Sequence, residues 1–344
     1  MRRTGGLFLK YLKWLGGLAA VALLLSKPEA ASRGAAEAMA RWYASVAPAL
    51  FPFLALMPLL TGGEAIRAYE TMLERPMKAC FGLPGAAAPG MIVGMAAGTP
   101  AGALAARNVA AGAGMDRGQL LRLVAATAGF SPAFLVGGIG VGMLNSAAMG
   151  WKLWVAQMLT QITLLVVLRG AWKRRGEGVV AIGTAVGDQP IRGAVMGILT
   201  ICGYMAMFGA LAGALGEWVG QGPADALVCL LDVPSGALRV SKLALPEALR
   251  LPLLAGMCGF GGMCVIAQSL GALKGCGAGA GAYMGIRVLA GAIEAGCMAL
   301  LLKLPQFKPG YLVEPIREKP LAAAMLIAAI LACPVMTRLK KSIS

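Results

Sequence analysis

The sequence predicts an all-α polytopic membrane protein with about eight transmembrane helices and two re-entrant helical hairpins in an inverted repeat. Three observations lead to this fold. Hydrophobic residues make up 58% of the 344 residues and gather in long blocks with almost no charge. Basic residues gather between certain blocks. Two apolar segments, one in each half of the chain, are interrupted by glycine and proline and share a short motif.

The apolar blocks are long enough to cross a bilayer, which takes about 20 mainly apolar residues. Only 13% of the chain is charged, roughly half of what a soluble domain carries. The predicted spans are 7–25, 45–61, 123–151, 153–168, 193–216, 251–273, 285–303 and 321–337. Lys10 and Lys13 lie in the first span, where lysines near a helix end can extend to the headgroups. The N-terminus resembles a signal peptide but has no convincing cleavage site at 26–28, so we expect it to be retained.

Basic loops orient the predicted spans. The loop RGAWKRR at 169–175 is the clearest marker, and the positive-inside rule puts it in the cytoplasm. If the chain has eight spans and both termini are cytoplasmic, the basic N-terminal and C-terminal segments also lie inside. The basic loop 304–320 then lies outside. The net charge of +16 therefore reflects cytoplasmic loops rather than nucleic-acid binding. Attraction of an anionic substrate by part of this charge is the alternative.

The residue types argue against an enzyme or a metal protein. The chain has no histidine, and its eight cysteines are scattered through apolar segments without a C-x-x-C pair. They are predicted to be small packing residues rather than a zinc, haem or disulfide framework. No phosphate-binding G-x-x-x-x-G-K-[ST] loop occurs, and the glycine-rich run 275–282 has no strand before it. We expect no catalysis, cofactor, metal or nucleic-acid partner.

The two interrupted segments indicate an internal repeat. Thr-Pro-Ala-Gly-Ala-Leu at 99–104 and Val-Pro-Ser-Gly-Ala-Leu at 233–238 share the pattern P-x-G-A-L. In each half a Leu-Arg-Leu and then a Gly-Phe follow in the same order. Because the predicted topology starts the two hairpins on opposite sides, the repeat is inverted, as in many secondary transporters. The expected units are 1–44, a first span with an amphipathic linker; 45–168, the first repeat with a hairpin near 84–110; 169–190, a basic cytoplasmic loop; 191–303, the second repeat with a hairpin near 224–243; and 304–344, a loop with a last span.

The hairpin tips are candidate binding sites, because the start of a half-helix presents free N–H groups and a partial positive charge. Two such starts, at 98–100 and 234–236, would favour an anion or a substrate rich in acceptors. Gly/Pro kinks that only help helices pack are the alternative. The motifs at 129–132 and 259–262 would break their helices and free carbonyls. There Phe130 and Phe260 either stack on a planar ring or simply pack, and Gln268 bonds either a substrate or another helix.

Charges inside apolar segments are the sharper signal. Arg107 and Arg239 each follow a hairpin tip, where an arginine can clamp a carboxylate. Asp232 and Glu294 are candidates for coupling to a cation or proton. The alternatives are a structural Arg239–Asp232 pair and a Glu294 that faces a water-filled vestibule. The predicted substrate-binding residues are Gly98, Thr99, Pro100, Arg107, Phe130, Ser131, Asp232, Ser235, Gly236, Arg239, Gly259, Phe260, Gly261 and Gln268.

The stretch from Pro48 to Leu302, about three quarters of the chain, resembles the sporulation integral membrane proteins of the YlbJ type, which carry nucleoside-recognition (Gate) domains. The similar passages are APALFPFLALMPLL at 47–60, MLERPMKACFGLPG at 72–85, GMAAGTPAGALAARNV at 94–109, LLDVPSGALRVSKL at 230–243 and AGMCGFGGMCVIAQSLGAL at 255–273. The last passage is also similar to the broken-helix motif of concentrative nucleoside transporters.

The resemblance implies a transporter in the mother-cell-derived membrane around the forespore, with dipicolinic acid (pyridine-2,6-dicarboxylate) as cargo. At the first hairpin tip, Thr99 stands where the sporulation proteins usually have an aromatic residue. The acidic residue that nucleoside transporters have at this tip is missing, which argues against sodium–nucleoside coupling. Asp232 stands where the family usually has glutamate. Two alternatives stay open: a non-transporting sporulation scaffold or gate subunit, and a nucleoside or nucleobase carrier. The expected partners are a small anion, the lipid bilayer, and a second copy or other sporulation membrane proteins.

Overall fold

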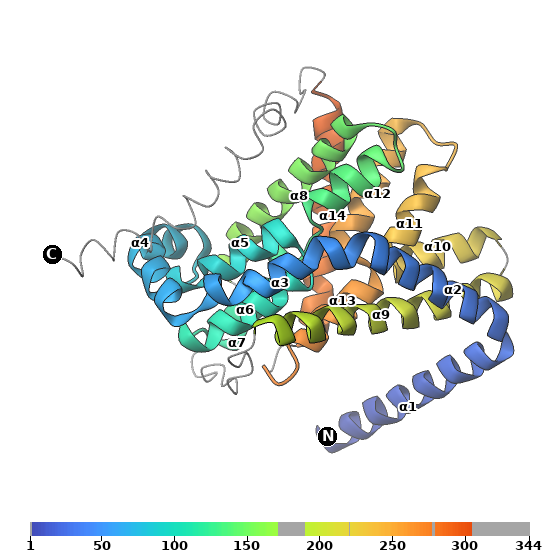
Figure 1. Cartoon of the computed structure of the whole chain (residues 1–344), viewed down its shortest axis with the longest axis horizontal. Helices are drawn as coiled ribbons and strands as arrows, with labels where there is room; N and C mark the ends of the chain where they lie inside the picture. The colour runs from blue at the N-terminus through green and yellow to red at the C-terminus, as the bar shows by residue number, and fades with distance from the viewer. Residues whose placement is uncertain (1, 171–189, 220, 277–278, 305–344) are drawn as a thin grey trace.

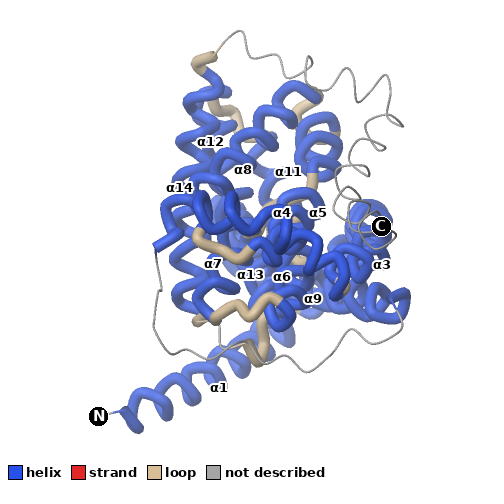
Figure 2. The backbone as a smooth tube through the Cα atoms, turned by 90° about the vertical axis from the view of Figure 1, so that its left-hand side faces the viewer, coloured by secondary structure: helices blue, strands red, loops and turns tan. Residues whose placement is uncertain are grey.

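The computed structural model describes residues 2–170, 190–219, 221–276 and 279–304, and all regular elements among them are helices (Figures 1 and 2). The first part comprises α1 (Arg2–Ser26), α2 (Pro28–Arg41), the π-helix η1 (Trp42–Val46), α3 (Ala47–Thr61), α4 (Gly63–Phe81), η2 (Gly85–Ala87), α5 (Ala88–Ala97), α6 (Ala101–Gly112), α7 (Arg117–Thr127), the π-helix η3 (Ala133–Val141), α8 (Ala147–Val167) and η4 (Leu168–Gly170). The second comprises α9 (Pro190–Val219), α10 (Gln221–Leu231), α11 (Val233–Ser241), α12 (Glu247–Phe260), α13 (Gly262–Ala272) and α14 (Ala280–Leu302). In both views α1 projects away from the other helices.

Both halves contain the same order of elements. In the first, α5 and α6 pack together as a helical hairpin, α7 and η3 form a helix broken near its middle, and α8 follows. In the second, α10 and α11 form the hairpin, α12 and α13 the broken helix, and α14 follows. The predicted helix breaks are confirmed, because α7 ends at Thr127 and α12 ends at Phe260. The three sequence matches between the halves thus fall on corresponding helices.

Within the part of the chain that the structure describes, four stretches are long and apolar enough to cross a membrane, namely Ala147–Gly170, Pro190–Val219, Glu247–Ala272 and Ala280–Leu302. The number rises to six if two strongly bent helix pairs, one before Thr61 and one before Ala97, each count as one span. The expectation of about eight spans with both termini in the cytoplasm stays a prediction. The predicted span 321–337 and most of the basic loop 169–190 lie outside the described residues.

The predicted boundary between spans 123–151 and 153–168 is wrong. Residues 142–146 form a turn in which Asn145 takes a positive φ of 52°. Ser146 then caps the next helix, with its hydroxyl accepting a bond from the N–H of Met149. A serine N-cap satisfies an N–H that the helix cannot satisfy itself, so α8 begins here rather than at residue 153.

Small residues allow α2 and α9 to pack closely over much of their length. Gly34 of α2 faces Gly209 and Gly213 of α9, and Ala38 lies beside Gly209. The four-residue spacing of the two glycines on α9 puts them on one helix face. Small residues at this spacing let helix backbones approach in a membrane, where van der Waals contact drives association.

Gly209→Ala is expected to destabilise the protein by about 1–3 kcal/mol, because a methyl group forced into a packed interface makes the helices separate. A Cβ at residue 209 would lie 2.6 Å from both the Ala38 Cβ and the Gly34 carbonyl oxygen. Gly203→Ala on the same helix is the control, since a Cβ there meets no atom within 4 Å. Thermal midpoints of the two variants in detergent measure the difference, and equal midpoints would contradict this packing.

Candidate functional site

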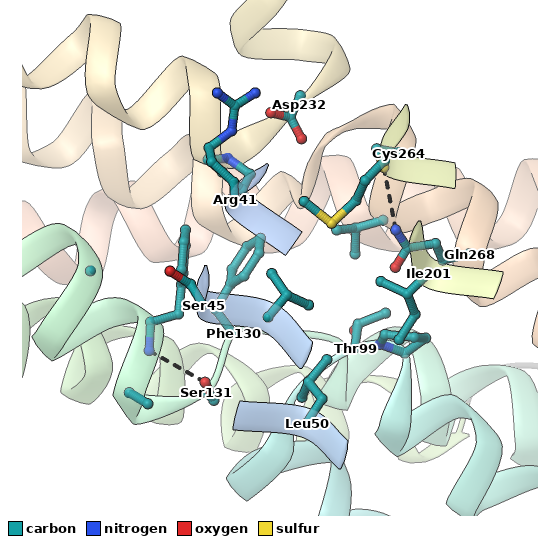
Figure 3. Close-up of a pocket in the computed structure, with 18 of the residues that line it drawn as sticks. Arg41, Ser45, Leu50, Thr99, Phe130, Ser131, Ile201, Asp232, Cys264 and Gln268 are labelled. Atoms are coloured by element: carbon teal, nitrogen blue, oxygen red, sulfur yellow. Dashed lines mark hydrogen bonds between the residues drawn. The ribbon is translucent and has the colours of Figure 1, made fainter. Parts of the chain in front are cut away.

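A cavity of about 570 Å³ lies where the two hairpin tips meet (Figure 3). This size is within the roughly 300–1,000 Å³ of small-molecule sites. Its walls come from the α5/α6 and α10/α11 tips, the α7/η3 break, α13, the α2–α3 bend and the middle of α9. We call it the hairpin cavity. Its polar side chains are Arg41, Ser45, Thr99, Ser131, Asp232 and Gln268.

The first hairpin tip rests on the broken helix of its own half. Gly98 has a φ of 74°, and a Cβ there would come within 2.5 Å of the Gly129 carbonyl oxygen, so only glycine fits. The Thr99 N–H donates to the same carbonyl at 2.9 Å. The predicted free N–H of Thr99 is therefore already used, and the Thr99 side chain is what the tip offers to the cavity.

The second hairpin tip is closed by its own carboxylate. Asp232 is 5% exposed and is the N-cap of α11, where its Oδ2 accepts from the Ser235 N–H at 3.0 Å and from the Ser235 hydroxyl at 2.5 Å. The helix start predicted at 234–236 to bind an anion is thus occupied by an anion of the protein itself. The structural Arg239–Asp232 pair considered as an alternative does not form, because Arg239 instead bonds Asp225.

Arg41 brings a cation to this tip from a distant part of the chain. It ends α2, and one of its Nη atoms donates to the Ser235 hydroxyl at 2.9 Å. Its Nε is buried and has no hydrogen-bond partner among the described residues. Figure 3 shows Arg41 beside Asp232 at one end of the cavity. Ser235 therefore links the cavity's arginine to its aspartate. The other Nη atom of Arg41 lies 3.8 Å from the Glu37 carboxylate, an ion-pair distance that leaves it able to donate to a bound anion.

Asp232→Ala is expected to destabilise the protein by about 1 kcal/mol, the usual cost of losing an N-cap acceptor. Asp232→Asn is expected to cost much less, because its side-chain oxygen can still accept from the Ser235 N–H. Thermal unfolding in detergent compares the two. If both variants lose the same stability, the carboxylate acts through its charge and not as a cap.

The break after α7 is bridged by a glutamine of α8. The Gln157 side chain accepts from the Phe130 N–H and donates to the Phe130 carbonyl, both at 2.8 Å. Gln161, one turn later, donates to the Thr127 carbonyl at 3.1 Å. The carbonyls predicted to be free for ions or substrate are therefore bonded, because an unsatisfied backbone group at membrane depth costs several kcal/mol.

The break after α12 is bridged by an arginine of α14. Arg287 is 2% exposed, and its guanidinium donates to the carbonyls of Gly259, Phe260 and Ala125, the last in α7 of the other half. Arg287 follows Phe260 by 27 residues, and Gln157 follows Phe130 by the same 27 residues. In each half, therefore, a polar side chain at a corresponding position bonds the backbone at the helix break.

The cavity gathers fewer than half of the predicted binding residues. Its lining includes Thr99, Pro100, Phe130, Ser131, Asp232 and Gln268. Phe130 packs on Phe134 with ring centroids 5.0 Å apart, and both line the cavity. Gly259 and Gly261 instead belong to the break that Arg287 occupies, and Phe260 packs in the core. Gly236 packs against Cys229 and Met257.

The remaining predicted charges lie away from the hairpin cavity. Arg107 donates to the Ala272 carbonyl at 3.2 Å and lines a second cavity. Glu294 is 2% exposed, faces Gly259 in the α12–α14 interface and lines neither cavity described here. The water-filled vestibule considered for Glu294 does not surround it. Its role in ion coupling stays a prediction.

Sequence reasoning missed Arg41, Gln157 and Arg287. Arg41 lies in a segment read as an amphipathic linker, and nothing local indicates that α2 folds back over the second hairpin. Gln157 and Arg287 had a usable signal, since each follows its Gly-Phe motif by the same distance. Alignment of the two halves beyond that motif would have paired these two polar residues.

Over 266 residues the chain is 26% identical to the sporulation integral membrane protein YlbJ of Bacillus subtilis (strain 168). This similarity covers 69% of the chain and 62% of that protein, so the chain spans less than two thirds of its relative's length. No family model and no solved structure matches the chain. The similarity supports the resemblance to the YlbJ proteins, and the nucleoside-recognition and nucleoside-transporter likenesses stay predictions. Together with the apolar helices, it describes a multi-pass integral membrane protein.

Proposed function

We propose that this protein carries a small planar anion, dipicolinate in the first place, across a membrane during endospore formation. The observation that carries the proposal is the hairpin cavity, where two corresponding hairpin tips and one broken helix meet beside Arg41. A scaffold has no need for paired broken helices around a cavity. Transporters use such helices to build substrate sites at the repeat interface.

The side chains around the cavity suit a flat dicarboxylate. Arg41 offers a guanidinium whose fork of donors matches a carboxylate. Phe130 and Phe134 provide an aromatic wall for a ring, and Thr99, Ser131 and Gln268 add neutral hydrogen-bonding groups. Asp232 is the one acid among the lining residues, and its carboxylate is held by the α11 N-terminus and Ser235. Its repulsion of an incoming anion is reduced accordingly.

The relative supports the biological setting, since its name places it in a membrane during sporulation. We extend that setting to this chain and assign it to the membrane around the forespore. Re-entrant insertion of the two hairpins from opposite sides is part of the proposal. It follows from the repeated order of elements and the predicted cytoplasmic loops.

Proteoliposomes containing the purified protein test the substrate. Uptake of radiolabelled dipicolinate above that of empty liposomes is the expected result, with uridine as the matched comparison. Uptake of uridine but not dipicolinate would establish a nucleoside carrier instead. If neither compound moves while deletion of the gene still blocks spore maturation, the protein is a scaffold and the transport proposal is wrong.

A further inference from the structure

A second cavity of about 420 Å³ lies next to the hairpin cavity. Its walls come from α3, α6, the first part of α9 and the end of α13. Nothing in the proposed site uses it. Three residues line both cavities, namely Pro100, Ile201 and Gln268.

Four chain segments run from one cavity into the other. Each contributes residues to both cavities within about a turn or two. In α9 the chain runs in the opposite direction, and Tyr204, next to Met205, still lines the second cavity. The pairs, first cavity before second, are Leu50 and Leu54 in α3, Thr99 and Leu104 at the start of α6, Met205 and Thr200 in α9, and Cys264 and Gly271 in α13. Four walls that pass in parallel between two hollows place these hollows end to end.

The three shared residues form a thin septum between the cavities. Ile201 is 3% exposed and Gln268 is 6% exposed, and Pro100 follows the first hairpin tip. Pro100 lies in the turn between α5 and α6, Ile201 in α9 and Gln268 in α13, so the septum holds only while the hairpin, α9 and α13 keep their positions. Gln268 also donates to Cys264 Sγ at 3.3 Å, which fixes its amide at the boundary.

The charges of the second cavity favour an anion. Arg107 and Lys274 line it together with Asn108, and no acidic side chain occurs among its lining residues in the described part of the chain. Arg107 is half-buried and uses one Nη atom on the Ala272 carbonyl, which holds the guanidinium in place. Two cations without a counter-charge in a concave site raise the local concentration of anions.

We infer that the second cavity is an anion-binding vestibule in series with the hairpin cavity, with Pro100, Ile201 and Gln268 as the barrier between them. The expected ligand is a small carboxylate. The role of this vestibule in transport rests on the proposed function. The hairpin cavity would then lead to one face of the membrane and the second cavity to the other. Movement of one repeat against the other would open the barrier between them.

Side-specific labelling tests the arrangement without any substrate. Ser131→Cys in the hairpin cavity and Asn108→Cys in the second cavity are treated with a membrane-impermeant maleimide in right-side-out and inside-out vesicles. Mass spectrometry reads each cysteine separately. We expect the two positions to react from opposite faces. Reaction of both from the same face, or no reaction at either one of them, overturns the serial arrangement whether or not dipicolinate is the substrate.

The septum has its own test. Ile201→Ala, combined with Asn108→Cys, should make residue 108 reactive from both faces. Ile198→Ala is the matched control, since Ile198 is buried on the same helix and lines neither cavity. One-sided reaction in the Ile201 variant, or two-sided reaction in the control as well, overturns the assignment of the barrier.

The ligand class is tested by protection of Asn108→Cys from the maleimide. Dipicolinate is the probe, and pyridine-2,6-dimethanol is the uncharged compound of similar shape. Protection by the dianion alone, lost in the Arg107→Gln, Lys274→Gln double variant, is expected. Equal protection by both compounds, or by neither, overturns the anion vestibule. The transport proposal is tested separately, by the uptake assay.

Discussion

Arg41→Gln is expected to reduce dipicolinate binding and uptake by about ten- to a hundredfold. A hydrogen bond to a charged group contributes about 1.5–3 kcal/mol, and each 1.4 kcal/mol is tenfold in affinity. Arg41 is the one cationic side chain that lines the hairpin cavity among the described residues. Its replacement removes the positive charge while glutamine keeps a donor for Ser235, so the hairpin contact survives.

The measurements are uptake into proteoliposomes and calorimetric titration with dipicolinate. Arg33→Gln is the control, because Arg33 lies two turns earlier on α2 and forms an ion pair with Glu217 at 3.0 Å, outside the cavity. Equal losses in both variants would mean that the charge of α2 acts nonspecifically. If Arg41→Gln transports normally and Arg239→Gln does not, the substrate site lies at the outer side of the second hairpin instead.

Arg287→Leu is expected to prevent stable folding. The guanidinium is the donor to three buried carbonyls, two at the break after α12 and one in α7. A buried acceptor left without a partner costs about 1–3 kcal/mol, so the summed loss is several kcal/mol. That is a large part of a typical total stability of about 5–15 kcal/mol. The yield of monodisperse protein and its thermal midpoint in detergent measure the effect.

The first half of the molecule supplies the control for this prediction. Gln157 bridges the corresponding break with an uncharged amide. Arg287→Gln should therefore retain more folded protein than Arg287→Leu, and Gln157→Leu should fall between the unaltered chain and Arg287→Leu. A leucine at 287 that yields as much folded protein as the unaltered chain would show that these carbonyls find other donors.

Local chemistry explains the parts of the fold that the sequence predicted. Long apolar blocks must be helical in a membrane, because only a helix satisfies the backbone within one segment. Gly261 ends α12 with a φ of 89°, a conformation that glycine adopts without strain. The paired P-x-G-A-L motifs mark the starts of α6 and α11. Pro234 lies in the first turn of α11, where proline is well tolerated, and Pro100 directly precedes α6.

The prediction of free backbone groups at the hairpin tips and helix breaks is wrong, because other groups of the chain bond them. For the Thr99 N–H and the two Gly-Phe breaks, the local sequence shows no partner, whereas the N-cap of α11 is Asp232, directly before that helix. In the folded chain the Gly129 carbonyl accepts from the N–H of Thr99, and Asp232 caps the start of α11. Gln157 and Arg287 bond the backbone at the first and second Gly-Phe break, respectively. Burial makes such satisfaction necessary, but sequence alone does not say which group provides it.

The sequence by itself determined an all-helical membrane chain, its internal repeat and the helix breaks, because periodicity, apolar length and glycine or proline act over a few residues. Only the tertiary structure decided which of those features form the hairpin cavity. Arg41 reaches Ser235 across 194 positions of sequence, and Arg107 turns toward a second cavity. Both placements depend on how α2, α9 and the hairpins pack, and that packing is set by long-range contacts between small residues rather than by any local motif.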